Sequence, residues 1–266
     1  MKAELPPSSY DGVAEVYDLY WGTASLLWLR TFGLLVLPRI ARGARILDLC
    51  CGTGRLAGEL SRRGFTLVGL DGSREMLRHG RKNAPTVPLI EADARRFGMR
   101  PSFDVVLSTF DSLNHILTLN ELQSAFRCVH DCLRPGGLFF FDLNTELGYL
   151  RHWNDSSEIV GDDHTMKVTA LYDRTRRLGL FRATIEHRAG GQVEEVELRQ
   201  RCHASGDVIS ALEAGGFTDI ETFGLEQEAI VPDCLDSAER AFYLCKRPAA
   251  AAGAFRPSAR RASKGA

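Results

Sequence analysis

The chain has 266 residues, 44% of them hydrophobic and 25% charged, and its formal net charge is −1. This composition is ordinary for a globular protein and excludes fibrous and wholly disordered classes. The start, MKAELPPSSY, carries an acidic residue and two prolines where a signal peptide needs an apolar run, so we expect a cytoplasmic protein. The apolar stretch 24–37 is interrupted by Arg30 and is too short to span a bilayer, which predicts an amphipathic helix packed on the core.

The seven cysteines are scattered and odd in number, which excludes a complete disulfide set. Cys128 and Cys132 would share one helix face, but no further ligands complete a zinc site around them. We therefore expect reduced thiols and no metal.

Short apolar runs alternate with helical patterns after the first 43 residues. Strands are predicted over 44–50, 66–70, 86–92, 103–109 and 137–144, and helices over 54–64, 73–83 and 120–133. The run GLFFFDLN is apolar on both faces, as a buried parallel strand must be. This order of elements predicts a parallel sheet with helices on both faces.

The pattern changes after residue 144. Three runs with period-two alternation, HTMKVTALYD, LGLFRATIEH and VEEVELRQR, are separated by polar turns and predict an inserted antiparallel meander. The helix DVISALEAGGF follows, and TDIETFG and AERAFYLCKR would add two antiparallel strands at the sheet edge. The expected fold is α/β, with a seven-stranded, mostly parallel sheet.

Basic residues are concentrated at the C-terminus. Six lie from Lys246 onward with no acidic residue among them, so the remainder of the chain carries −7. An acidic body argues against a large nucleic-acid footprint. The composition of the tail predicts disorder, and contact of this basic arm with RNA or acidic lipid is the alternative.

The segment ILDLCCGTGRLA carries the most information about a ligand. A strand leads into a turn with Gly52 and Gly54, where a ligand could approach the backbone closely, and a helix begins there. Together with Ala57 this spacing also fits a dinucleotide site. Asp48, four residues before Gly52, would repel a pyrophosphate but suits a ligand's ammonium group.

Two further acids follow the next two strands. Asp71 could accept hydrogen bonds from both ribose hydroxyls, and Asp93 could accept one from the exocyclic amine of adenine. Met76, one helical turn beyond Asp71, could pack on the adenine face. Each acid alone could be a helix cap, but three at the ligand-binding edge of one sheet indicate an adenosine ligand.

The motifs LDLCCGTGRL, VGLDGSREML, EADARRF, FDVVLSTFDSLNHI and LRPGGLFFFDLN resemble those of the class I S-adenosylmethionine-dependent methyltransferases, in order and spacing. The resemblance implies a Rossmann-like fold with S-adenosyl-L-methionine as cofactor. It also implies that Asp71 binds the ribose and that Thr109 contacts the methionine through its backbone. Gly72 is a further cofactor-binding candidate, although members of the family usually carry a larger apolar residue at its position. The other cofactor-binding residues that the resemblance implies are Asp48, Cys50, Gly52 and Gly54 for the methionine, Asp93 and Ala94 for the adenine, and Tyr10 and Tyr17 in an N-terminal lid, besides Met76.

Methyl transfer from S-adenosylmethionine needs few catalytic groups, because the sulfonium methyl group is already activated. In-line transfer depends mainly on alignment of the acceptor and exclusion of water. A base is needed only for a protonated acceptor, and we predict His115 in that role. Tyr17 and Asn144 are further catalytic candidates, Trp21 is a candidate pocket wall, and Asp111 is a second candidate for proton handling. His187 and His203 are weaker candidates.

We expect methyl transfer to nitrogen or oxygen of a small molecule by a monomer or homodimer with no membrane partner. The expected division is 1–43 helical lid, 44–144 cofactor-binding core, 145–204 meander acting as substrate lid, 205–247 end of the core and 248–266 basic tail. The sequence STFD after the fourth strand disfavours nucleobase amino methylation in this family. Alternatives are an RNA or protein methyltransferase docking through the tail, an NAD(P)-dependent oxidoreductase, and a non-catalytic S-adenosylmethionine-binding protein.

Overall fold

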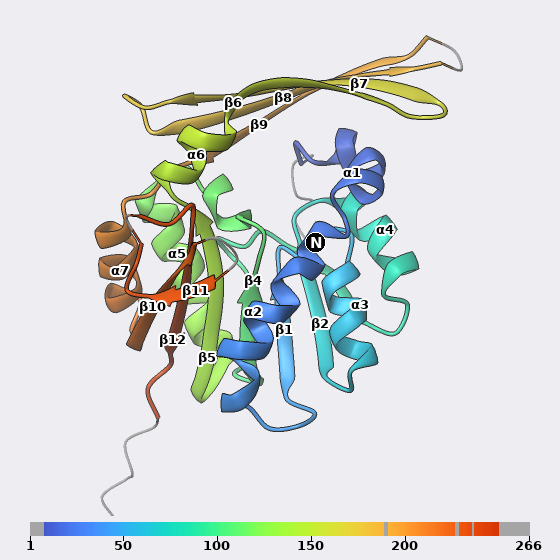
Figure 1. Ribbon diagram of the computed structural model, residues 1–266. Helices are drawn as coiled ribbons and strands as arrows, with labels where there is room; N and C mark the ends of the chain where they lie inside the picture. Colours follow the sequence, from blue (N-terminus) through green and yellow to red (C-terminus); the bar gives the residue numbers. More distant parts are fainter. Residues whose placement is uncertain (1–7, 189–190, 227–228, 236, 250–266) are drawn as a thin grey trace, which may run out of the picture.

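The computed structural model describes residues 8–188, 191–226, 229–235 and 237–249. The basic tail predicted over 248–266 therefore lies almost wholly outside the described residues. A mixed sheet of eight strands in the order β11-β10-β12-β5-β4-β1-β2-β3 forms the centre of the protein (Figure 1). The parallel strands are β1 (Arg45–Leu49), β2 (Thr66–Asp71), β3 (Leu89–Glu91), β4 (Phe103–Ser108) and β5 (Leu133–Asn144).

Three antiparallel strands complete one side of this sheet: β10 (Thr218–Glu226), β11 (Ala229–Pro232) and β12 (Arg240–Lys246). The predicted α/β class and the mostly parallel sheet are confirmed. The eighth strand is β11, a short segment that pairs with β10 and that the alternation pattern did not reveal.

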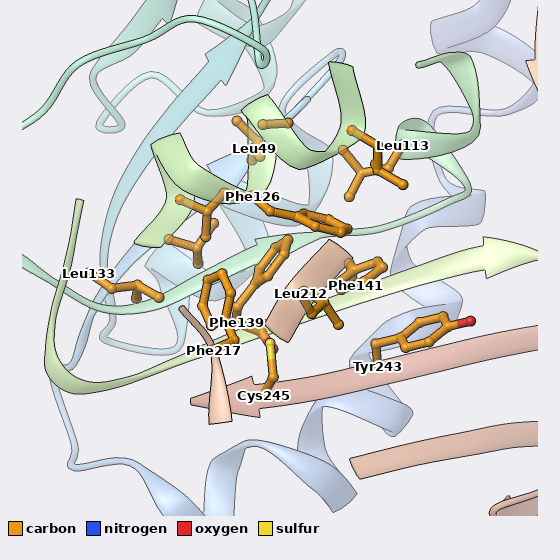
Figure 2. Close-up of a cluster of buried hydrophobic side chains, with 14 of the residues drawn as sticks. Leu49, Leu113, Phe126, Leu133, Phe139, Phe141, Leu212, Phe217, Tyr243 and Cys245 are labelled. Atoms are coloured by element: carbon orange, nitrogen blue, oxygen red, sulfur yellow. The ribbon is translucent and has the colours of Figure 1, made fainter. Parts of the chain in front are cut away.

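Helices cover both faces of the sheet because each presents an apolar stripe to it. On one face lie α5 (Leu119–Cys132) and α7 (Ser205–Ala214), and their apolar residues join a cluster of buried aromatic side chains from β5 and β12 (Figure 2). Phe139, Phe141 and Tyr243 lie at the centre of this cluster and stack on one another. The other face is covered by α2 (Trp28–Leu35) and α3 (Arg55–Arg62), while α4 (Arg74–Asn83) follows β2.

A second sheet of four antiparallel strands lies above the carboxyl ends of the parallel strands (Figure 1). It is reached through α6 (Glu146–His152) and consists of β6 (Asn154–Val160), β7 (His164–Asp173), β8 (Leu178–His187) and β9 (Val193–Arg201). We call it the roof sheet. The meander was predicted with three strands, and β6 escaped prediction because NDSSEIV is polar and exposed, as an edge strand can be.

The first part of the N-terminal segment lies between the roof sheet and the central sheet, and the rest runs along one face of the central sheet (Figure 1). The segment comprises the short 3-10 helix η1 (Asp11–Val13), α1 (Ala14–Tyr20), and the helical turns η2 (Ala24–Leu27) and η3 (Leu37–Arg39) on either side of α2. Val13 and Val16 pack against Met166 and Ile185 on the lower face of the roof sheet. The single amphipathic helix predicted over 24–37 is therefore three short pieces. Among the described residues, no helix is both long and apolar enough to cross a membrane.

Candidate functional site

Three adjoining cavities lie at the carboxyl edge of the parallel strands. The inner pocket is narrow and lies beside the glycine turn after β1. The edge pocket, of about 630 Å³, lies beside the segments that follow β2 and β3. The roof cavity, of about 450 Å³, lies between the N-terminal segment, the loop after β4 and the roof sheet.

The walls of these cavities are shared. Cys50 borders both the inner and the edge pocket, and Tyr17 borders both the inner pocket and the roof cavity. Tyr10 and His115 border both the edge pocket and the roof cavity. Ligands in neighbouring cavities would therefore lie against common side chains.

The two glycines of the turn have different roles. Gly52, with φ +53°, borders the inner pocket, where a ligand can approach it. Gly54, with φ +71°, lies beside α4, and a Cβ atom there would be 3.1 Å from the Cα of Gly80. Among the described residues, Gly54 is not in the lining of the three cavities, and its lack of a side chain allows close packing of α3 on α4.

Asp48 is buried beneath the inner pocket, which it borders, and is only 2% exposed. Its Oδ2 atom has no hydrogen-bond partner among the described residues. Burial, reinforced by the nearby carboxylate of Asp71, raises the pKa of Asp48 to about 8. A buried carboxylate oxygen without a partner is costly, and a cationic ligand group would satisfy it. The residues present therefore fit the ammonium of a methionine moiety.

Asp71 holds the glycine turn as well as its own loop. Its Oδ2 accepts from the Gly52 amide at 2.8 Å and its Oδ1 from the Ser73 amide at 2.8 Å. Burial raises the pKa of Asp71 despite these hydrogen bonds. Each carboxylate oxygen keeps a second lone pair that could accept from a hydroxyl.

The remaining cofactor candidates divide between the cavities and the core. Gly72, Asp93 and Ala94 border the edge pocket, and Thr109 borders the inner pocket. Burial would raise the pKa of Asp93, but hydrogen bonds from Arg95 outweigh it and lower the pKa. Among the described residues, Met76 is buried and borders none of the three cavities.

His115 forms a defined pair with Tyr10. Its Nδ1 lies 2.9 Å from the carbonyl oxygen of Arg199, which can only accept, so Nδ1 carries the proton. Nε2 therefore holds a lone pair and accepts from the Tyr10 hydroxyl at 2.8 Å. Burial lowers the pKa of His115, which favours the neutral imidazole.

A charged cluster, of which the sequence analysis named only Asp111, lies beside the roof cavity. Arg240 of β12 pairs with Asp111 at 2.9 Å and with Asp142, which is fully buried in β5. Asp142 also accepts from the backbone amides of Phe110 at 2.7 Å and Asp111 at 3.0 Å, and both of these residues have positive φ. The cluster carries one more negative than positive charge. A single acid inside the apolar run FFFDLN was the signal that could have revealed it.

Gln200 of β9 is the second residue that sequence analysis missed. It is 3% exposed, borders the roof cavity and donates to Asp111 Oδ2 at 2.6 Å. Asn144 and Trp21 also border the roof cavity. His203 Nε2 lies 2.8 Å from the carbonyl oxygen of Ile116, and His187 lies 4.0 Å from the carboxylate of Glu194. Among the described residues, neither histidine borders the three cavities.

The comparisons agree with this architecture. Residues 46–137 match the model of the methyltransferase domain family. A putative methyltransferase of Bacillus subtilis (strain 168) is 31% identical over 153 residues, which is 56% of this chain and 60% of the relative. One from Geobacillus sp. (strain WCH70) is 27% identical and matches 90% of this chain and 100% of the relative. The dTDP-3-amino-3,4,6-trideoxy-alpha-D-glucopyranose N,N-dimethyltransferase of Streptomyces venezuelae is 32% identical and matches 47% of this chain and 54% of the relative.

Solved structures share the fold over most of the chain. An S-adenosylmethionine-dependent methyltransferase from Clostridium acetobutylicum has a TM-score of 0.71 at 21% identity, with 91% of this chain and all of that chain covered. The sugar N-methyltransferase KedS8 from Streptoalloteichus sp. has a TM-score of 0.69 at 18% identity, with 93% and 96% covered. Residues 46–137 therefore belong to the methyltransferase domain family, and the chain is similar over most of its length to S-adenosylmethionine-dependent methyltransferases.

Proposed function

We propose that this protein transfers a methyl group from S-adenosylmethionine to an amine nitrogen of a small molecule. The observation that carries the proposal is that the inner pocket, which fits the methionine end of the cofactor, shares Tyr17 and Phe110 as walls with the roof cavity. A reacting group in the roof cavity would lie beside the methionine end of the cofactor.

Apart from Asp71, which lies behind the glycine turn and is not among the described residues that border these pockets, the proposed cofactor residues border the inner or the edge pocket. Asp48 would pair with the ammonium, the turn at Cys50 and Gly52 would approach the methionine, and Asp93 would accept from adenine. Asp71 would hold both the turn and the ribose. Bound S-adenosylmethionine supplies a methyl group activated by a sulfonium sulfur, so the protein's task is alignment and exclusion of water.

The walls of the roof cavity support a nitrogen acceptor. Tyr17, Trp21 and Phe181 present aromatic faces, and Asp111 presents a carboxylate from a cluster with excess negative charge. Aromatic faces and a carboxylate both stabilise a cationic centre, which a methylated amine becomes. A hydroxyl acceptor would gain less from these charges. The relative whose printed name includes an amino sugar substrate supports the same chemistry.

His115 would act as the base. Its neutral Nε2 can take the proton that the acceptor nitrogen loses when the new carbon–nitrogen bond forms. Tyr10 can relay this proton. Its hydroxyl, which lies 2.8 Å from Nε2, would give its own proton to Nε2 and take the proton of the acceptor nitrogen in exchange. Asn144 and Tyr17 would orient the acceptor.

In this proposal the described residues of the segment 1–43 would cover both ligands, those of 145–204 would form the roof over the acceptor, and those of 44–144 and 205–247 would provide the cofactor-binding core. A test incubates the protein with methyl-labelled S-adenosylmethionine and a panel of amines, including nucleotide-linked amino sugars, each matched with its hydroxyl analogue. We expect label in one or more amines and little in the analogues. Label only in RNA or protein, or cofactor binding without any transfer, would reject the proposal.

A further inference from the structure

Gln200 is the side chain that connects the roof sheet to the chemistry of the site. Its amide nitrogen lies 2.6 Å from Asp111 Oδ2 and 3.1 Å from His115 Nε2. Its amide oxygen accepts from the hydroxyl of Tyr149 at 2.8 Å and from Asn144 Nδ2 at 3.3 Å. All hydrogen-bonding positions of the carboxamide are therefore engaged.

These partners fix which end of the amide faces His115. The carboxylate of Asp111 is paired with Arg240, and a carboxylate only accepts hydrogen bonds. The end of Gln200 that faces Asp111 must therefore be the NH₂ group. The same NH₂ group then presents its second hydrogen to His115 Nε2.

The other ring nitrogen is fixed independently. Nδ1 faces the carbonyl of Arg199, so it must donate, while Nε2 faces two donors, Tyr10 and Gln200. We propose that Gln200 is a positioning residue that holds His115 in the tautomer whose Nε2 lone pair is on the side of the roof cavity. This inference rests on the proposed function for its purpose, but the tautomer itself does not depend on any acceptor.

The pH dependence follows from the groups around the imidazole. The phenol of Tyr10 faces it from the N-terminal segment and the carboxylate of Asp111 from the loop after β4. Arg199 and Glu197 of β9 border the same edge pocket and are paired with each other. A donor aimed at Nε2 stabilises the neutral ring, so removing it raises the pKa of His115. It also frees the negative charge of Asp111, which acts in the same direction.

The test is long-range ¹H–¹⁵N correlation of the full chain labelled at histidine, with the His115 signals assigned from a His115→Asn variant. In the unsubstituted protein at pH 7 we expect a protonated Nδ1 and a bare Nε2. In Gln200→Met, which keeps length but removes the donor, the titration midpoint should rise by about one pH unit or more. In Gln200→Glu the midpoint should rise further, because a carboxylate would face Nε2.

Gln192→Met is the matched control. Gln192 directly precedes β9, donates to the carboxylate of Glu194, and is not among the described residues that border the three cavities. It should leave the His115 midpoint unchanged. A protonated Nε2 in the unsubstituted protein, or an unchanged midpoint in Gln200→Met, would overturn the proposal. If Gln200→Met does not fold, the tautomer in the unsubstituted protein and the Gln200→Glu titration decide. Failure of methyl transfer to every amine would reject the proposed function without altering this tautomer.

Discussion

Asp18 of α1 binds Arg55 through two hydrogen bonds of 2.8 Å, although 37 residues separate them. Arg55 directly follows Gly54 and borders the inner pocket. Asn83 donates to the same carboxylate at 2.9 Å and to the carbonyl of Thr53 at 2.8 Å. The N-terminal segment is thus fastened to the turn that the cofactor is expected to approach.

This attachment predicts that Asp18→Ala weakens cofactor binding. Loss of a partly buried, two-pronged ion pair should cost about 1 kcal/mol, or roughly fivefold in affinity. Calorimetry with S-adenosylmethionine and its demethylated product measures it. Glu15→Ala is the control, because Glu15 is exposed on the same helix and should leave affinity unchanged. Equal affinity in both variants would mean that the attachment does not support the pocket.

Cofactor affinity should depend on pH through Asp48. Its pKa of about 8 means that the carboxyl is largely protonated below pH 8, so binding an ammonium there must displace a proton. Affinity should rise by up to about tenfold per unit from pH 6 towards 8. It should fall again above 8, as the ligand's amine, with a pKa of roughly 7.7 to 8.0, loses its charge. Calorimetry in buffers of different ionisation enthalpy tests this, and the rising limb should be absent in Asp48→Asn.

The same residue should reduce stability in the absence of ligand. The folded-state pKa of Asp48, about 8, lies above its unfolded value of roughly 3.9, so this carboxyl destabilises the fold increasingly from pH 4 to 8. Asp48→Asn does not ionise and should raise the free energy of unfolding at pH 8.5, by at most about 6 kcal/mol. Near pH 4, where the Asp48 carboxyl is protonated in both the folded and the unfolded chain, the variant and the unsubstituted protein should differ little in free energy of unfolding through ionisation. Urea titrations at both pH values measure it, and a pH-independent change would show that ionisation is not the cause.

Removing the imidazole should affect turnover more than binding. His115→Ala should lower kcat by about 100-fold while the cofactor Kd stays within about twofold, if Nε2 receives the acceptor's proton. Raising the pH should restore little of this loss, since the base itself is missing. His187→Ala, at the far end of the roof sheet, is the control. A variant that loses cofactor affinity in parallel with kcat would indicate a structural role for His115.

Asp142 should be the most costly of the described acids to neutralise. Asp142→Asn would leave Arg240 with one carboxylate and weaken the hydrogen bonds that hold the Phe110 and Asp111 amides. Breaking a buried pair costs about 3 to 5 kcal/mol, whereas an exposed pair is worth less than about 1 kcal/mol. Glu221→Gln, which breaks the exposed pair with Arg39, provides that comparison by denaturant unfolding.

Local pattern was enough to predict the parallel strands and the acids that follow them. Asp48 and Asp71 lie at the carboxyl ends of β1 and β2, and Asp93 follows β3, so their shared edge follows from strand order alone. Gln200 and Arg240 contact Asp111 from 89 and 129 residues away, and only the folding of the roof sheet and β12 brings them there. The polar strand β6 was missed for a related reason, because its pairing with β7 rather than its own side chains makes it a strand.

The position of Tyr10 has a kinetic consequence. Because this residue borders both the edge pocket and the roof cavity, the segment that carries it lies against the proposed positions of the cofactor and of the acceptor. If ligand exchange requires this segment to move, exchange of the cofactor and of the acceptor depends on the same part of the chain. When that part opens more slowly than the methyl group is transferred, a rapid burst of product in the first turnover precedes a slower steady state, and the opening rate sets the turnover number.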